Sequence, residues 1–492
     1  MKKPIFSPLK LALISGLLVG LSYPPFFGIL ALFAFIPLIR VWLTVKIIDS
    51  IKYSYFAAII ANAISLYWIG LNTGASFLPV MISLVAAILY LSIFWAILGG
   101  AISWFKDRFN YVEYLIPFLW VSMELIRSYG PLAFSWSNLA LTQTKFINIL
   151  QIIDTTGSEG VAFWIIFINV ALYLSFFTNK LNAKKNLILF LMAIIPIFYG
   201  SYKLHALKNI NWEKRNISII QPNIDPNQKW EASYRNELYE VMDSLNTIAY
   251  SLKPDLVLWP EAALPNYMRV SYLNNKFEKL VDSTSIPLMM GTLDYKASSN
   301  DKKIYNGSIF FSSKENKLYH KLFLVPFAEY IPLSSRFPIL KQLNFGQGNF
   351  SHGDEFTTFE LDSVLFSNMI CYDSTNPLLA RKFIVEGARF LTIEANVAWL
   401  QNSSGVRQYY EIAKLRAVEY RTGIAMSANT GISAIINPFG KETHKASFNE
   451  QKVFKGEVFL NNELTFYAKY GNIFSKLCLF ISLICFALIK IK

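Results

Sequence analysis

Three residues in the second half of the sequence carry side chains that can do chemistry together: a carboxylate, an amine and a thiol. Glu261 ends the apolar run 258–260, where partial burial can raise the pKa of a carboxylate and make it a usable base. Lys321 opens a strongly apolar run, and a cation held there can stabilise a forming oxyanion. Cys371 ends the run 367–370, and a thiolate is a strong nucleophile when a base or a cation activates it.

Each of these residues is by itself compatible with an ordinary structural role. A glutamate at a strand end or a single lysine is usually solvated, and a single cysteine is often buried and inert. The other two cysteines, Cys478 and Cys485, lie in an apolar stretch near the C-terminus, so the sequence predicts no disulfide framework. Cys371 therefore stands alone in its polar segment, and its function has to be sought in the residues around it.

The segment between Tyr202 and Tyr470 has the pattern of a layered α/β domain, because short β-rich runs alternate with polar turns and helical patterns. One helix is predicted at Glu411–Arg421. The predicted strands are Asn216–Ile220, Leu256–Trp259, Leu288–Gly291, Ser308–Phe311, Val364–Ile370, Phe390–Glu394 and Ile424–Ala428. These strands would place the carboxylate and the thiol at strand ends, where α/β domains tend to build their sites.

The rest of the chain has the composition of a membrane protein. Of its 492 residues, 53% are hydrophobic and 16% are charged, whereas soluble domains carry roughly 25% charged residues. A membrane helix needs about 20 mostly apolar residues. Eight stretches fit: 9–22, 26–45, 55–71, 78–105, 111–126, 160–177, 186–202 and 472–489. We therefore predict an eight-span helical bundle (1–212 with 467–492) and an α/β domain (213–466).

Positive charges predict how this chain is oriented. Lys and Arg gather in alternate loops and at both termini, which the positive-inside rule assigns to the cytoplasm. They are Lys2, Lys3, Lys10, Arg40, Lys46, Lys52, Lys106, Arg108, Lys180, Lys184, Lys185, Lys490 and Lys492. The α/β domain then lies outside the cytoplasm. The net charge of +13 is attributed to these flanking residues and not to a nucleic-acid partner.

The order of the glutamate, the lysine and the cysteine, each in its own motif, resembles the nitrilase superfamily, also called carbon–nitrogen hydrolases. The glutamate follows a Trp-Pro strand end, the lysine precedes a Pro-Phe-x-Glu stretch, and the cysteine ends a strand. The segments 395–399 and 421–431 are similar to later motifs of that family. The resemblance covers about residues 213–460 and implies an αββα sandwich with a Glu-Lys-Cys triad.

Together with the predicted spans, this domain resembles the apolipoprotein N-acyltransferase family. The motifs are Phe33–Leu38, Trp120–Arg127, Gln221–Ile224, Lys229-Trp230 and Lys321–Pro332. The resemblance implies an enzyme of the inner membrane of a Gram-negative bacterium, with its catalytic domain in the periplasm. It would move an acyl chain from a phospholipid through a thioester to the α-amine of a diacylglyceryl-cysteine at a lipoprotein's N-terminus. No cofactor or metal is implied, and the four histidines show no ligand spacing.

The resemblance also assigns roles to residues. It gives Glu261 as the base, Lys321 as the oxyanion-stabilising cation and Cys371 as the nucleophile. Supporting positions are Glu329, Tyr372, Asp373, Trp230 and Asn306. Two positions depart from the family pattern: Asp373 stands where glutamate is typical, and Val397 stands where aspartate is common.

Two other functions share some of these features. A membrane-anchored amidase or nitrilase would use the same triad on small amides with water, but it would not need a large bundle of spans. A transporter or scaffold with an inactive domain would favour charges inside the spans, which are nearly absent here. The glycine-containing segment 346–353 is expected to form a mobile lid.

Overall fold

The computed structural model describes residues 6–178, 182–208, 210–298, 301–334, 336–337 and 349–490. It divides the chain into two compact units. The first comprises Met1–Gly70, Val80–Asn209 and Tyr470–Lys492, and the second comprises Leu71–Pro79 and Ile210–Lys469. The short segment Leu71–Pro79, which links two helices of the first unit, therefore belongs with the α/β unit.

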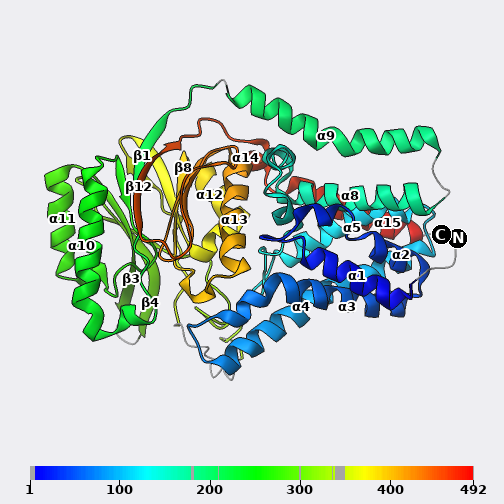
Figure 1. The fold of residues 1–492 in the computed structure, drawn as a ribbon, viewed down its shortest axis with the longest axis horizontal. Coiled ribbons are helices and arrows are strands. Elements are labelled where there is room, and N and C mark those ends of the chain that lie inside the picture. Colours follow the sequence, from blue (N-terminus) through cyan, green and yellow to red (C-terminus); the bar gives the residue numbers. More distant parts are fainter. Residues whose placement is uncertain are drawn as a thin grey trace. The chain divides into compact units, whose positions relative to one another are not determined.

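The first unit is helical (Figure 1). Four of its helical segments are long and apolar enough to cross a membrane: Ile47–Leu71, Phe77–Lys106, Ser158–Phe177 and Ala183–Lys208. Shorter apolar helical segments are Pro8–Gly20, Gly28–Thr44 and Ile473–Ile489. The helices are α1 (Pro8–Gly20), α2 (Ile36–Thr44), α3 (Ile47–Leu66), α4 (Phe77–Lys106), α5 (Val112–Arg127), α6 (Ile147–Leu150), α7 (Ile153–Thr156), α8 (Ser158–Phe177), α9 (Ala183–Lys208) and α15 (Ile473–Lys490).

Large apolar side chains cover the outside of this unit, as expected for helices in contact with lipid. Phe198 on α9 is 67% exposed and Phe176 on α8 is 76% exposed. Inside, α1 and α3 approach closely, because a Cβ added to Gly16 would lie 2.3 Å from the carbonyl oxygen of Ala57. Small residues at such crossings let helix backbones come together where no hydrophobic effect drives association.

A buried ion pair shapes the loop that follows α5. Glu124 accepts hydrogen bonds from the N–H of Leu139 (3.1 Å) and from Asn138 (3.3 Å). Arg127 donates to the carbonyl of Ser137 at 2.9 Å, and its guanidinium lies 3.7 Å from the Glu124 carboxylate. Within the first unit, this pair satisfies backbone groups at the start of the short 3-10 helix Leu139–Gln143, where no helical partner is available to them.

The second unit is a sandwich of two six-stranded sheets. One sheet has the order β12-β1-β2-β3-β4-β5 and the other β11-β10-β9-β8-β7-β6. The strands are β1 (Lys214–Gln221), β2 (Leu256–Leu258), β3 (Leu288–Ser298), β4 (Asp301–Phe311), β5 (Lys317–His320), β6 (Phe359–Leu361), β7 (Val364–Ile370), β8 (Phe390–Ala395), β9 (Gly423–Ala428), β10 (Ser433–Ile436), β11 (Glu442–Ala446) and β12 (Lys452–Phe459).

Helices cover the outer faces of both sheets (Figure 1). On the first sheet lie α10 (Arg235–Ser251) and α11 (Leu273–Thr284), whose apolar faces share one core with β1–β4. On the second sheet lie α12 (Pro377–Val385) and α13 (Ser404–Tyr420), and the short helix α14 (Phe466–Tyr470) follows β12. This is the αββα arrangement that the resemblance to the nitrilase superfamily implies.

The seven predicted strands and the predicted helix are all present, with some different bounds. Strands β3 and β4 extend beyond the predicted segments into an 11-residue hairpin arm each. Helix α13 begins at Ser404 instead of Glu411, capped by the Ser403 hydroxyl. Residues 346–348 of the predicted lid lie outside the described residues, whereas 349–353 are described. Gly353 packs against β5, and its N–H donates to the carbonyl of Lys321 at 2.9 Å.

Candidate functional site

The candidate site is assembled from strand ends of both sheets. In the first sheet, Glu261 follows β2, Asn306 lies within β4 and Lys321 directly follows β5. In the second sheet, Cys371 follows β7 and Asn396 follows β8. The base and the nucleophile predicted from sequence therefore come from different sheets, and sheet packing fixes their geometry.

Cys371 occupies a strained turn. Its φ is +47°, a left-handed value that costs a residue with a side chain about 1–3 kcal/mol. The turn continues as a short 3-10 helix, Cys371–Thr375. The carbonyl of Cys371 accepts hydrogen bonds from the hydroxyls of Ser374 (2.9 Å) and Tyr409 (3.0 Å). These bonds hold the turn, which carries the thiol on a short rigid segment between β7 and α12.

The Glu261 carboxylate is buried, with 7% of the residue exposed, and donors from both sheets surround it. One oxygen accepts from the Asn306 amide at 2.8 Å and lies 3.5 Å from Lys321 Nζ. The other oxygen accepts from the backbone N–H of Asn396 at 2.7 Å. Both oxygens are thereby fixed, so Glu261 has a defined orientation before any substrate arrives.

Lys321 is 1% exposed and lies between two carboxylates. Its Nζ is 2.9 Å from Glu329 and 3.5 Å from Glu261. Burial alone would lower the pKa of Lys321, but these two carboxylates outweigh burial and raise the pKa above its ordinary value. Glu329 is held in turn by Asn306 (3.0 Å) and by the N–H of Val325 (2.8 Å). Lys321 therefore stays a fixed cation.

The surroundings of Cys371 favour the protonated form of its thiol. Burial, followed by the Glu261 carboxylate, raises its pKa well above the ordinary value, while Lys321 and the N–H of Asn396 oppose this shift only in part. A neutral thiol attacks a carbonyl efficiently when a base accepts its proton in the same step. The electrostatics of this cluster thus favour base-assisted attack over a preformed thiolate.

Asp373 joins the nucleophile turn to the segment after Lys321. Its carboxylate accepts from the N–H of Phe323 (2.7 Å), the N–H of Ile370 (3.0 Å) and the hydroxyl of Tyr319 (2.8 Å). Burial raises the pKa of Asp373 to about 6. The aspartate side chain reaches all three donors, so the shorter side chain still ties the two segments together. Beside it, Tyr372 stacks on Phe323 with ring centres 5.1 Å apart.

The segment that carries Trp230 also contains Lys229, which sequence reasoning named only as part of a motif and to which it gave no role. Trp230 is 47% exposed. The preceding Lys229 is 2% exposed and donates to the carbonyl of Ala262, the residue after Glu261. Ala262 has a left-handed φ of +44°. Burial lowers the pKa of Lys229 to about 8, against the opposing effect of Glu261. Only its place next to a predicted tryptophan could have drawn attention to it.

Val397, the second departure from the family pattern, is an apolar packing residue. It is 4% exposed and contacts Gly431, whose added Cβ would lie 2.6 Å from a Val397 methyl carbon. The neighbouring Asn396 side chain accepts from Asn429 at 3.3 Å. In this chain the turn after β8 is therefore held by packing and by an asparagine pair.

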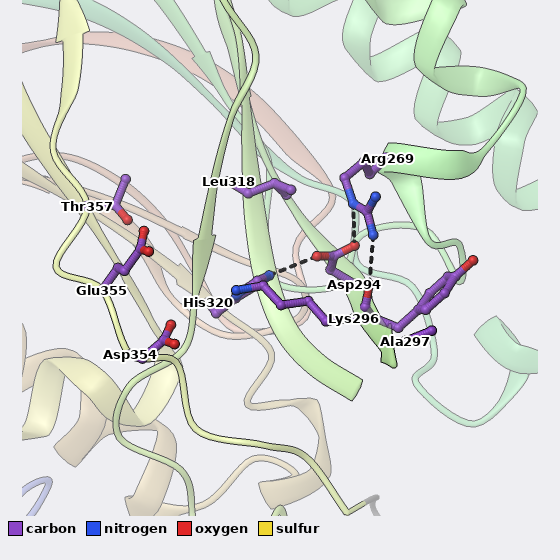
Figure 2. A pocket seen from close by; sticks show the side chains of 10 residues that line it. Arg269, Asp294, Lys296, Ala297, Leu318, His320, Asp354, Glu355 and Thr357 are labelled. Carbon is purple, nitrogen blue, oxygen red and sulfur yellow. Dashed lines mark hydrogen bonds and ion pairs between the residues drawn. The ribbon is translucent and has the colours of Figure 1, made fainter. Parts of the chain in front are cut away.

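A polar cavity of about 580 Å³ is lined by residues of β3, of β5 and of the segment 354–357 (Figure 2). Asp294 at its floor pairs with Arg269 (2.9 Å) and with His320 (2.9 Å). Burial would raise the pKa of Asp294, yet hydrogen bonds from these two partners lower it overall. His320 lines this cavity while the adjacent Lys321 joins the carboxylate cluster, as expected from strand alternation. The triad does not line the cavity.

Comparisons with known proteins agree with this architecture. Residues 15–171 match the model of the apolipoprotein N-acyltransferase N-terminal domain, and residues 216–462 match that of carbon-nitrogen hydrolases. An apolipoprotein N-acyltransferase of Geobacter metallireducens is 29% identical, with 95% of this chain and 92% of the relative aligned. One of Chlorobaculum tepidum is 28% identical over 97% and 95%.

Among solved structures, a carbon-nitrogen hydrolase from Helicobacter pylori G27 is 15% identical, with a TM-score of 0.38. It aligns with 50% of this chain and with 88% of its own length. An amidase from Nesterenkonia sp. has the same identity and score over 53% and 94%. Taking the two family matches with the full-length relatives, this chain belongs to the carbon–nitrogen hydrolases and, within them, to the apolipoprotein N-acyltransferase family.

Proposed function

We propose that this chain N-acylates lipoproteins, moving an acyl chain from a phospholipid through a Cys371 thioester to the α-amine of an N-terminal diacylglyceryl-cysteine. One observation carries the proposal: a buried carboxylate and a buried cation, Glu261 and Lys321, lie 3.5 Å apart in the same cluster as a cysteine on a left-handed turn. Membership of the apolipoprotein N-acyltransferase family supports this choice of substrates.

The first half-reaction forms the thioester. Cys371 Sγ attacks the ester carbonyl carbon of the phospholipid while its proton passes to Glu261. The carbonyl oxygen gains the negative charge, and the Lys321 cation stabilises it. When the tetrahedral intermediate collapses, the ester C–O bond breaks and Glu261 returns the proton to the leaving oxygen. A lysophospholipid departs, and the acyl chain stays on Cys371.

The second half-reaction transfers the acyl chain to nitrogen. The neutral α-amine of the diacylglyceryl-cysteine attacks the thioester carbonyl, and Glu261 takes one amine proton. The C–S bond then breaks, the Cys371 sulfur recovers that proton, and an amide is released. Glu261 therefore carries one proton in each half-reaction, and the enzyme ends as it began. Such a scheme predicts ping-pong kinetics.

The supporting residues have distinct proposed tasks. Glu329 holds Lys321 in place by its 2.9 Å contact. Asn306 holds both Glu261 and Glu329. Asp373 and Tyr372 fix the wall beside the nucleophile, and the half-exposed Trp230 is available to contact lipid substrate.

The membrane segments hold the enzyme in the membrane, where the acyl donor and the anchored acceptor are found. We propose eight spans with both termini in the cytoplasm, and the α/β unit on the periplasmic side of the inner membrane. The four long apolar helices and the shorter apolar ones support a multi-span arrangement. Both substrates are anchored in the membrane, so confining the enzyme there raises their local concentration around the nucleophile.

A trapping experiment tests the proposal. Membranes that contain the chain are incubated with a phospholipid bearing an alkyne-labelled acyl chain and then with a diacylated lipopeptide. We expect a hydroxylamine-sensitive adduct that disappears as N-acylated lipopeptide forms. Cys371→Ala should abolish both signals, whereas Cys478→Ser should retain them.

The same experiment separates this function from hydrolysis of small amides. A hydrolase would release labelled fatty acid without lipopeptide product. The mechanism is wrong if wild type forms no adduct. It is also wrong if Cys371→Ser forms as much hydroxylamine-sensitive thioester as wild type, because that thioester would be on another cysteine.

A further inference from the structure

Beneath the candidate site lies a carboxyl group that the proposed reaction does not use. Glu394 is on β8, two residues before the Asn396 N–H that binds Glu261. In the sheet register it pairs with Ile370, the residue before Cys371. The residue is fully buried, with 0% exposed. A carboxyl group in such a position is rare and costs stability unless its polar atoms are used.

Glu394 takes part in a polar cluster that crosses from one sheet to the other. Its Oε2 accepts a 2.6 Å hydrogen bond from the hydroxyl of Ser308 on β4. That hydroxyl accepts from the Asn368 amide on β7 at 2.8 Å, and Asn368 accepts from the Thr392 hydroxyl at 2.8 Å. All four residues are fully buried. In the apolar interior of the sandwich, this cluster provides polar contacts that require one fixed arrangement of the sheets.

The cluster is connected to both halves of the candidate site. Ser308 lies two residues after Asn306 on β4, so both side chains are on the same face of the strand, and Asn306 holds Glu261 and Glu329. Glu394 lies beside the end of β7, where Cys371 begins its turn. A shift of one sheet over the other would change the distance between base and nucleophile, and the Ser308–Glu394 bond opposes that shift.

The surroundings of Glu394 favour its uncharged form. No lysine or arginine forms an ion pair with it in the described part of the chain, and its Oε1 has no hydrogen-bond partner among the described residues. Burial raises the pKa of Glu394 well above its ordinary value and the negative charge of Glu261 adds to this effect, while the side chains of Ser308 and Asn368 oppose it only in part. A second anion here would also oppose the oxyanion that the proposed mechanism forms.

We propose that Glu394 is a positioning residue: as a neutral carboxylic acid it joins the sheet that carries the base to the sheet that carries the nucleophile. This inference rests on the proposed acyl-transfer function for its effect on turnover. Its effect on the distance between Glu261 and Cys371 does not depend on that function.

The test uses the full-length protein in detergent with Cys478→Ser and Cys485→Ser, so that Cys371 is the single thiol. Three variants are compared: Glu394→Gln keeps the size and the neutral charge, Glu394→Asp shortens the reach, and Glu394→Ala removes the bond. Glu463→Gln, at an exposed position, is the matched control. Thermal unfolding checks that each variant is folded. Two readouts are measured: the rate of Cys371 alkylation by iodoacetamide against pH, and kcat and KM for N-acylation of a diacylated lipopeptide.

We expect Glu394→Gln to keep kcat within about twofold and to leave the pH profile of alkylation unchanged. Glu394→Asp should lower both kcat and the alkylation rate by about tenfold or more with little change in KM, because small displacements of reacting groups are costly. If Glu394→Gln loses as much as Glu394→Asp, or shifts the pH profile, the carboxyl group titrates during the reaction and the inference is wrong.

The inference also fails if folded Glu394→Asp and Glu394→Ala both match wild type. Failure of the proposed function gives a different result. In that case wild type would be alkylated at Cys371 but would not acylate the lipopeptide. The alkylation rates of the three variants would then still decide whether Glu394 positions the nucleophile.

Discussion

At the residue scale, Asp373 makes the site sensitive to pH. Its pKa of about 6 in the folded chain lies above the ordinary value of 3.8, so the folded state binds this proton more tightly than the unfolded state. Its contribution to stability is therefore complete below about 3.8 and is lost as pH rises through about 6. Catalysis needs the opposite form, because the anion accepts the N–H groups of Phe323 and Ile370.

From this we predict that thioester formation slows as pH falls from 7 to 5, with a midpoint near 6. In the same range the Asp373 contribution to the free energy of unfolding rises. Stopped reactions with labelled phospholipid measure the rate of thioester formation. Denaturant unfolding of Asp373→Asn against wild type isolates the contribution of Asp373 to the free energy of unfolding. If thioester formation in Asp373→Asn has the same acid midpoint as in wild type, the titration belongs to another group.

Lys229 provides a second prediction at this scale. Lys229→Met keeps much of the side-chain volume but leaves the Ala262 carbonyl without its buried donor. An unsatisfied buried acceptor costs about 1–3 kcal/mol, and the turn that carries Glu261 loses a restraint. We expect lower stability by that amount and a kcat reduced by about tenfold with KM little changed. Lys279→Met, at an exposed position of α11, is the control. Equal loss in the control would contradict a specific role.

The order of three motifs, and the family resemblance that they carry, selected Glu261, Lys321 and Cys371 from sequence. Residue type and position alone gave no role to Lys229 and did not point to Glu394. In a sequence, a buried charged residue looks the same as a solvated one. Its burial depends on partners such as Ala262 and Ser308, which are 33 and 86 residues away along the chain.

At the element scale, the close approach of β3 to the end of β2 sets the position of the base. A Cβ added to Gly291 would lie 2.5–2.7 Å from the backbone of Pro260, Glu261 and Ala262. Backbone atoms cannot move aside as the end of a flexible side chain can. Overpacking therefore lowers the free energy of unfolding by about 1–3 kcal/mol. We predict that Gly291→Ala lowers both the melting temperature and kcat.

Gly70→Ala is a suitable comparison for this change. Its nearest neighbour is a Leu84 methyl carbon at 2.8 Å, the end of a flexible side chain. It should therefore stay close to wild type in the same thermal and kinetic measurements. A Gly291→Ala protein with wild-type stability and kcat would show that the strand end is not fixed by this contact.

The inner strands could be predicted because both faces of each are covered, which produces an apolar run in β2 and mostly apolar runs in β8 and β9. The sequence patterns of the edge strands did not predict them. Strand β6 has three residues and β5 has four, and β11 is mostly exposed with no apolar alternation. The start of α13 was missed because Ser404 and Gly405 are poor helix formers that tertiary packing buries.

At the scale of the whole molecule, composition separated membrane from α/β parts, but helix length alone does not give the number of spans. Four helical segments meet the length and hydropathy of a span. Helices α1 (13 residues), α5 (16) and α15 (18) are shorter than the roughly 20 residues that a bilayer requires of a straight helix. The count of eight spans therefore stays a prediction, and loop charge is its independent support.

Orientation can be tested with the chain's own loops. The positive-inside pattern puts Lys184, in the first turn of α9, in the cytoplasm and the β4–β5 turn, with the exposed Ser313, outside. In a background without the three native cysteines, a membrane-impermeant thiol reagent should label Ser313→Cys in intact cells. It should label Lys184→Cys only after permeabilisation. The reverse pattern would put the nucleophile on the cytoplasmic side, where a periplasmic lipoprotein N-terminus could not reach it, and the proposed acceptor would have to be abandoned.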